Sequence, residues 1–152
     1  MGAQGVSLYE AAGGEAGMLA LAHAWHRRVL ADEVVAHAFS HGFDPHHSQR
    51  LAAYWGEALG GPATFTSRCG TESDVVRMHS GNGMHGDMDD RAVACFDAAL
   101  EDAGIADADL RATLHDYFAW ATRTAMNAYP RSADEVPDGL RVARWSWDGL
   151  AS

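Results

Sequence analysis

The chain has 152 residues, a length that suits one domain with one hydrophobic core. Its formal net charge is −10 and all eleven basic residues are arginine, so we expect no broad basic surface for nucleic acid or anionic membrane. Hydrophobic residues make up 47% of the sequence and charged residues 21%, which is typical of a globular fold.

The ends of the chain and its two cysteines narrow the class of protein further. The N-terminal stretch lacks the basic start and long apolar run of a secretion signal, and no segment reaches the roughly 18 apolar residues of a membrane span. Cys69 and Cys95 form no Cys-x-x-Cys-His run, which excludes covalent haem attachment of that type. We therefore expect a reduced, cytoplasmic protein.

Hydrophobic positions recur at helical spacing along most of the chain, and no convincing alternating strand is present. The pairs Gly13-Gly14 and Gly60-Gly61 interrupt the pattern, Asp44-Pro45 is typical of a helix start, and a long loop is expected after Pro62. Thr71-x-x-Asp74 resembles a capping box that opens a short helix. These signals predict an all-α protein with helices over residues 8–12, 15–30, 33–39, 45–59, 72–79, 88–103 and 107–129.

The chain after Pro130 has a different character. Pro137-Asp138-Gly139 marks a turn, and Trp145 and Trp147 stand close together near the C-terminus. Two large indole rings in a short segment favour docking onto the body of the protein over disorder. We therefore divide the chain into a body, residues 1–130, and a docked tail, residues 131–152.

His79 is the histidine with the most informative position. It follows Val75 by four residues and Val76 by three, so helical spacing places it on their buried face. A buried imidazole is most often a core residue bonded to a carbonyl group. The alternative is a metal ligand whose second ring nitrogen donates to the backbone. Periodicity alone favours the core residue.

The other histidines are less distinctive. His26 lies near the apolar face of its helix, and His47 lies in the first turn of the next long helix. Asp87, Asp89 and Asp90 gather at a helix start, where they favour the helix dipole. The remaining histidines have no characteristic spacing beyond a weak metal-type pair at positions 37 and 41, and we expect them at the surface: His23, His37, His41, His46, His85 and His115.

Four segments follow one another along the chain in a characteristic order: "SLYEAAGG" at 7–14, "RLAAYWGEALGGP" at 50–62, "VVRMH" at 75–79 and "HDYFAWATRTAMNAYP" at 115–130. In this order and spacing they resemble truncated haemoglobins, and the resemblance is closest to group II. The resemblance covers roughly residues 7–130. It implies a truncated globin fold for residues 1–130, a two-over-two helical sandwich around haem b that is bound without a covalent link. The tail, residues 131–152, lies beyond the matched region.

The resemblance also implies roles for individual residues. His79 matches the proximal histidine that ligates iron, which reverses the interpretation from periodicity. The distal ligand pocket would be formed by His26, His47, Phe39, Leu51 and Val93. Further haem contacts would come from Arg50 and Arg77, placed to meet propionates, and from Met78, Phe65 and Tyr54.

Two of these positions depart from the group II pattern. His26 stands where those proteins usually have tyrosine, and Val93 stands where they usually have tryptophan. Imidazoles would then replace phenol and indole as hydrogen-bond donors to the ligand. Because imidazole titrates near neutral pH, ligand binding should depend on pH. Either His26 or His47 could instead coordinate iron directly.

The resemblance implies reversible binding of oxygen and of other diatomic ligands such as nitric oxide and carbon monoxide. Nitric-oxide dioxygenation and peroxide reduction are enzymatic alternatives, and turnover would need an external reductase. A homodimer is also left open. Two other classes compete with this interpretation: a non-haem, histidine-rich metalloenzyme with zinc or nickel, and a haem-less globin-fold sensor module. A visible spectrum of the purified protein separates them.

Overall fold

The computed structural model describes residues 5–37, 45–81, 83 and 85–151, and within them the chain is mainly helical. The α-helices are α1 (Leu8–Ala11), α2 (Gly14–Ala31), α3 (Glu33–Ala36), α4 (His47–Ala58), α5 (Thr64–Arg68), α6 (Glu72–Met78), α7 (Gly86–Asp102) and α8 (Ala108–Trp120). The chain continues with a π-helical turn η3 (Ala121–Ala125), a 3-10 turn η4 (Ala133–Glu135), and strands β1 (Trp145–Ser146) and β2 (Gly149–Leu150).

The sequence predicted the long helices, and the structure confirms them with shifted ends. Helix α4 begins at His47 rather than at Pro45, and the last long helix ends at Trp120 with the η3 turn after it. The predicted cap Asp44 lies outside the described residues. Thr71 Oγ1 accepts from the backbone N–H of Asp74 at 3.1 Å, as the capping box requires, and Asp107 caps α8 in the same way. Two expectations were wrong. The stretch after Pro62 contains helix α5, because burial of Phe65 and bonds to Glu57 stabilise one helical turn. The tail contains a two-residue hairpin, too short to show alternation in the sequence.

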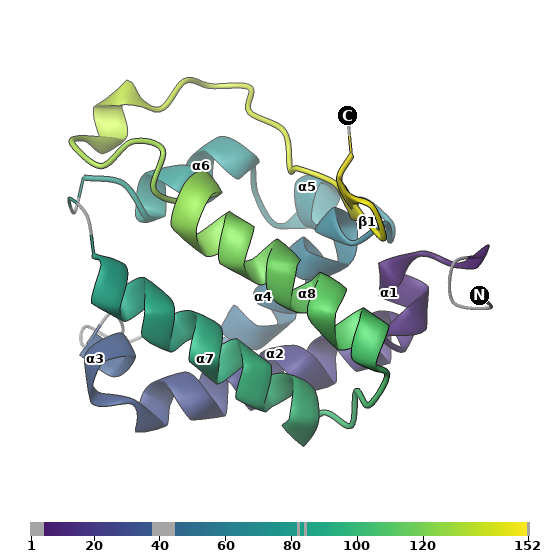
Figure 1. Cartoon of the computed structure of the whole chain (residues 1–152). Helices are drawn as coiled ribbons and strands as arrows, with labels where there is room; N and C mark the ends of the chain where they lie inside the picture. The colour runs from purple at the N-terminus through teal and green to yellow at the C-terminus, as the bar shows by residue number, and fades with distance from the viewer. Residues whose placement is uncertain (1–4, 38–44, 82, 84, 152) are drawn as a thin grey trace.

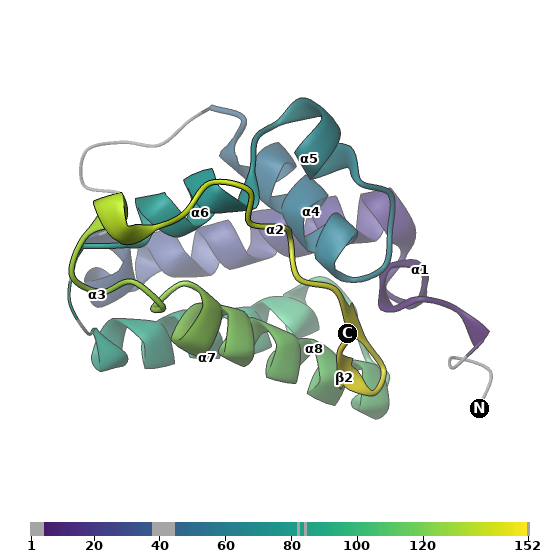
Figure 2. The ribbon, with the colours of Figure 1, turned by 90° about the horizontal axis from the view of Figure 1, so that it is seen from above.

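The long helices form two packed pairs. Helix α2 packs against α4, α8 packs against α7, and α2 also packs against α7. Figure 1 shows α7 and α8 in front of α2 and α4, and Figure 2 shows the same two layers from above. This is the two-over-two arrangement that the sequence resemblance implied.

One group of rings, which we call the aromatic cluster, joins the two layers. It consists of Trp25 on α2, Trp55 on α4, Phe96 on α7 and Phe118 on α8. Trp55 packs edge-on against the other three rings, with centroid distances of 5.3 to 5.9 Å, while Phe96 and Phe118 stack at 4.3 Å. Each of the four long helices therefore contributes one ring to a shared core.

The second glycine pair allows the first helix to lie across the end of α4. The N–H of Tyr9 donates to the carbonyl oxygen of Leu59 at 2.9 Å. A Cβ atom on Gly61 would lie 2.7 Å from the Tyr9 ring, and a Cβ on Gly56 would lie 3.1 Å from it. Gly61 therefore needs glycine for close approach, Gly56 leaves little room for a larger residue, and Gly60 needs glycine for its φ of +98°.

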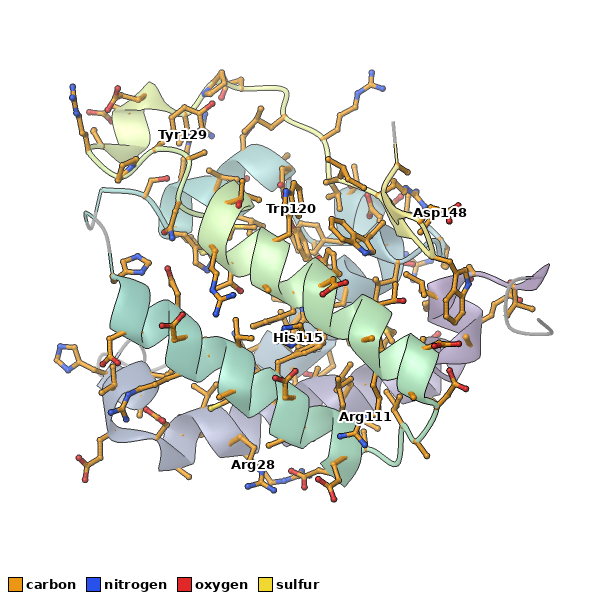
Figure 3. The ribbon with its side chains drawn as sticks, viewed as in Figure 1. Arg28, Arg111, His115, Trp120, Tyr129 and Asp148 are labelled. Carbon is orange, nitrogen blue, oxygen red and sulfur yellow. The ribbon has the colours of Figure 1, made fainter. Side chains whose placement is uncertain are left out.

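The tail follows the surface of the helices rather than extending away from them. In Figure 1 it passes α6 and α8 and ends in the hairpin near α1. Trp145 packs against Tyr117 and Trp120, and Trp147 Nε1 donates to the carbonyl oxygen of Val6 at 2.9 Å. Figure 3 shows Trp120 on α8 beside this hairpin.

Among the described residues, no helix has the length and apolarity that a bilayer span would require.

Candidate functional site

Helix α6 carries His79 at its C-terminal end, where the residue caps the helix. The Nδ1 atom of His79 lies 2.8 Å from the carbonyl oxygen of Val75, one turn earlier. A carbonyl oxygen can only accept, so we assign the proton to Nδ1. The Nε2 atom then keeps its lone pair. This is the tautomer that a metal-binding imidazole needs.

The sequence placed His79 on the buried face of α6, but its side chain has exposed surface, whereas Val76 is buried. The difference arises because α6 ends at Met78, so the capping residue projects beyond the last turn. Desolvation by the surrounding protein still lowers the pKa of His79 below its ordinary value. The surrounding protein thus disfavours the protonated ring, and the exposed surface of His79 leaves the ring accessible to a ligand.

A polar group built on α7 lies close enough to His79 to influence its charge. His85 Nδ1 lies 2.9 Å from Asp89 Oδ1, and Asn127 Nδ2 donates to Asp89 Oδ2 at 2.7 Å. The sequence placed His85 at the surface, but the structure shows it partly buried. Asp89 stands in the first turn of α7, as the sequence indicated, and its side chain is also buried. The long-range partner Asn127 explains the burial, and it could not be read from local spacing.

His26 and His47 come together although α2 and α4 carry them separately. Their ring centroids lie 4.9 Å apart at an interplanar angle of 55°. Ser48 is buried, and its Oγ lies 3.5 Å from His26 Nδ1. Burial lowers the pKa of His26 below its ordinary value, and repulsion from His23 lowers it further. Both rings therefore form one imidazole pair, and His26 favours its neutral form.

The apolar residues expected around the ligand pocket are placed differently from one another. Val93 on α7 is 3% exposed, and Leu51 on α4 is half-buried and packs against the core. Met78, at the end of α6, is 70% exposed. Phe39 lies outside the described residues.

Tyr54, Phe65 and Glu72 form a buried unit that ties α4, α5 and α6 together. Tyr54 donates its hydroxyl to Glu72 Oε1 at 2.6 Å, and its ring packs edge-on against Phe65 at 5.1 Å. Burial raises the pKa of the Glu72 carboxyl above its ordinary value, and it also raises the pKa of Tyr54. This unit fixes the start of the helix that ends at His79.

The two arginines expected at haem propionates already have protein partners. Arg50 donates from Nη2 to the carbonyl oxygen of Cys69 at 3.1 Å, which ties α4 to the end of α5. Arg77 donates to Asp74, to the carbonyl oxygen of Val136 and to Asp138. A propionate would therefore have to share each guanidinium with these groups.

A cavity of about 450 Å³ lies elsewhere, between α1, α2, α4 and α5. Its lining includes Tyr9, Met18, Gln49 and Gly56, and it shares no residue with the predicted haem contacts. Because none of the predicted ligand residues lines it, this cavity is separate from the candidate haem site.

Three polar residues near these histidines gave no signal in the sequence: Ser48, Glu72 and Ser73. All three are buried. Each lies in the first turns of a helix, where polar residues ordinarily face water or cap the helix, so local pattern did not indicate burial. Only their long-range partners distinguish them.

The competing metalloenzyme needs several ligands in one place. Among the residues that the structure describes, no three His, Cys, Asp or Glu side chains gather in a way that could hold a metal ion. His41, half of the weak metal-type pair, lies outside those residues. The described part of the chain thus gives that alternative no supporting cluster.

Comparison with known proteins places the chain in a family. Residues 7–127 match the model of the family described as bacterial-like globin. A group 1 truncated haemoglobin from Tetrahymena pyriformis is 29% identical over 102 residues, which cover 67% of this chain and 80% of that protein.

Solved structures agree with this result. The thermostable haemoglobin from Thermobifida fusca has a TM-score of 0.67 and 28% identity, over 80% of this chain and 96% of its own. The group II truncated haemoglobin from Bacillus anthracis has a TM-score of 0.68 over 77% of this chain and 88% of its own, and at 18% identity it shows a shared fold. The family match, the two-over-two helices and these relatives together establish that the chain belongs to the bacterial-like, truncated globins, a family of haem proteins that bind small diatomic ligands such as oxygen.

Proposed function

We propose that this globin holds haem b without a covalent link, with His79 Nε2 as the proximal iron ligand, and that it binds oxygen and other diatomic ligands reversibly. The observation that carries the proposal is the 2.8 Å contact between His79 Nδ1 and the Val75 carbonyl oxygen. That bond orients the imidazole and leaves its second nitrogen basic, as ligand histidines require. Bound haem would supply an iron centre whose behaviour depends on the axial ligand and on the polarity of the distal side.

The surroundings of His79 fit an apolar ring with acidic edges. The side chain of Met78, next to the ligand, is a large apolar group that is 70% exposed, and a porphyrin would remove it from water. Arg50 and Arg77 offer guanidinium groups that could share a propionate with their present partners. Tyr54 and Phe65 are buried, and Tyr54 bonds to Glu72 at the start of α6. We therefore assign these two residues to holding α6, and with it His79, in place.

The imidazole pair supplies donors on the distal side. A neutral imidazole N–H from His26 or His47 can stabilise partial negative charge on a diatomic ligand, by roughly 1.5–3 kcal/mol for a charge-assisted hydrogen bond. Val93 and Leu51, with Phe39, would form the apolar part of the same pocket. The lowered pKa of His26 keeps this donor neutral at physiological pH.

Several finer points stay predictions from the sequence. They include direct iron coordination by His26 or His47, a homodimer, and a cytoplasmic location. Nitric-oxide dioxygenation and peroxide reduction stay predictions as well, and each would draw electrons from an external reductase.

The test is haem titration of the purified chain with absorption spectroscopy and metal analysis. The unaltered protein should bind one haem and develop a Soret band. His79→Ala should weaken haem retention at least about tenfold, equivalent to about 1.4 kcal/mol. His115→Ala is the matched control, because His115 on α8 pairs with Asp97. A colourless protein with bound zinc or nickel, or unchanged haem retention in His79→Ala, would refute the proposal.

A further inference from the structure

We propose that the tail segment 136–140 braces the proximal helix α6, and that Ser73 and Arg77 are positioning residues through which this brace fixes the ring of His79. The inference rests on the proposed function, because it takes His79 as the haem ligand. The family match ends at residue 127, so the bracing segment lies outside the matched region. The tail would thus act on the haem site without contacting haem.

Ser73 makes the most specific contact. It is 2% exposed, and its hydroxyl donates to the carbonyl oxygen of Pro137 at 2.7 Å while accepting from the N–H of Leu140 at 3.1 Å. In a four-residue turn the first carbonyl and the fourth N–H ordinarily pair with each other. Here the hydroxyl of Ser73 bonds to both of these groups. The turn and the helix therefore hold each other in place.

Arg77 extends the same contact by one helical turn. Residues four apart lie on one face of a helix, so Ser73 and Arg77 present the same side of α6 to the tail. Arg77 Nη2 donates to the carbonyl oxygen of Val136 at 3.2 Å and pairs with Asp138. Because the Asp138 side chain is 92% exposed, its ion pair alone contributes little. The bond to the backbone carbonyl and the burial of the Val136 side chain therefore hold Arg77 against the tail more firmly than the ion pair does.

The chain that follows His79 is attached to the start of the tail. The N–H of Gly81 donates to the carbonyl oxygen of Tyr129 at 3.2 Å, and the N–H of Gly83 donates to that of Pro130 at 2.9 Å. Residues on both sides of His79 in the sequence, Ser73 and Arg77 before it and Gly81 and Gly83 after it, therefore bond to segment 129–140. The ring itself is held by Val75, one turn back on the same helix. A displacement of α6 would consequently carry Nε2 with it.

The brace predicts a specific defect when it is broken. Replacing Ser73 with alanine removes both hydrogen bonds between its hydroxyl and the turn, so that the bonds of Arg77 carry the contact between α6 and segment 136–140. Helix α6 should then move more freely against the tail. Haem should be lost faster, and the iron–histidine bond should change, while the imidazole pair on α2 and α4 keeps its contacts.

The experiment uses the full, haem-loaded chain and compares Ser73→Ala with Ser67→Ala. Ser67 is an exposed serine of α5 whose hydroxyl donates to the carbonyl oxygen of Ala63, one turn back along the chain. We measure the rate of haem transfer to an excess of a high-affinity acceptor protein, and the iron–histidine stretching frequency of the ferrous form by resonance Raman. Ser73→Ala should lose haem about tenfold faster and shift the band. Ser67→Ala should match the unaltered protein.

Two further variants separate the brace from a general effect on folding. Asp138→Ala removes an exposed side chain that pairs with Arg77, and it should shift the iron–histidine band in the same direction as Ser73→Ala but less, so it tests the brace even if Ser73→Ala does not fold. The Raman band is the readout for this variant, because an Arg77 released from Asp138 is also freer to bind a propionate. Arg144→Ala removes a tail contact far from α6, the bond to the Gly61 carbonyl oxygen, and should leave the Raman band in place.

The outcomes distinguish the two proposals. If the unaltered protein holds haem through His79 but Ser73→Ala keeps the same rate and the same band and Asp138→Ala keeps the same band, the brace is refuted and the proposed function stands. If the unaltered protein takes up no haem, the proposed function fails and the brace has no role at this site.

Discussion

The two sides of the candidate haem site are held in different ways. On the side of His79, polar contacts surround one short helix: Thr71 caps it, Tyr54 bonds to Glu72, and Ser73 and Arg77 bond to the tail. On the side of His26 and His47, two rings from different helices lean on each other at 4.9 Å, and the Ser48 contact is long at 3.5 Å.

This difference indicates that the contacts around His79 hold a helix in position, whereas those around His26 and His47 set the polarity of the ligand pocket. A seven-residue helix is too short to be stable by itself, so its orientation must come from tertiary contacts, and α6 has them on several faces. The distal rings stand on two long helices that the aromatic cluster already fixes. Because those helices are fixed, replacing the side chain at position 26 or 47 should change the polarity of the pocket without disturbing the fold.

The largest expected effect lies in the aromatic cluster that supports both sides. Trp55→Ala removes a ring that is 3% exposed and contacts one ring from each of the other long helices. We expect a loss of roughly 3–5 kcal/mol in the free energy of unfolding. Chemical denaturation followed by helix signal and by haem absorbance should give coincident transitions. Transitions that separate would show that the two sides unfold independently.

A substitution in the imidazole pair should change ligand kinetics with little effect on stability. His26→Leu removes a donor and should speed oxygen dissociation roughly 10- to 100-fold, measured by stopped flow. His37→Leu, at an exposed position, is the control. Oxygen dissociation that is equally fast in both variants would assign the donor to another group.

The same pair should give the ligand kinetics a pH dependence. The folded-state pKa of His26 lies below its ordinary value of 6.5, so the ring is neutral above pH 6.5 and becomes protonated as pH falls through the folded-state pKa. Protonation works against burial and against repulsion from His23, so we expect the charged ring to turn out of the pocket toward water and to stop donating to the ligand. Oxygen dissociation should therefore be flat above about pH 6.5 and faster below it. A profile that stays flat in acid would remove His26 from this role.

On the proximal side, loss of one buried hydroxyl should cost moderate stability. Tyr54→Phe deletes the donor to Glu72 and should lower the free energy of unfolding by about 1–3 kcal/mol. Tyr9→Phe, in α1, is the matched control, because that ring packs against Gly61 outside α6. Equal losses in the two variants would mean that the Tyr54 hydroxyl contributes nothing particular to α6.

The smallest effect concerns the charge of Glu72. Its folded-state pKa lies above the ordinary value of 4.5, so its contribution to stability is fully present below pH 4.5 and is lost as pH rises through the folded-state pKa. Glu72→Gln can still accept the Tyr54 hydroxyl but cannot ionise. We expect its stability relative to the unaltered protein to rise by a few tenths of a kcal/mol or more from acid to neutral pH. Thermal unfolding across that pH range would detect the rise. A fall in the relative stability of Glu72→Gln would contradict a free-energy cost for ionising the buried Glu72 carboxyl.

Much of the fold followed from local sequence. The capping box at Thr71, the helix start near residue 107 and the glycine pair at Gly60-Gly61 depend on a few residues each, so spacing was enough to locate those helix ends. Helix α5 was missed because one buried ring and the carboxylate of Glu57 stabilise it from outside the segment. The exposed setting of His79 was also missed, because helical spacing assumes that the helix continues past Met78.

The sequence by itself determined the all-α class, the position of the ligand candidate after a capped turn, and the acidic surface, because these depend on residue type and on contacts within a turn or two. Tertiary structure alone decided that Ser73 bonds to a turn more than sixty residues away, that Arg77 faces the tail, and that His26 and His47 meet. Those contacts depend on how helices pack, and packing is set by the summed burial of many side chains that no short window of sequence contains.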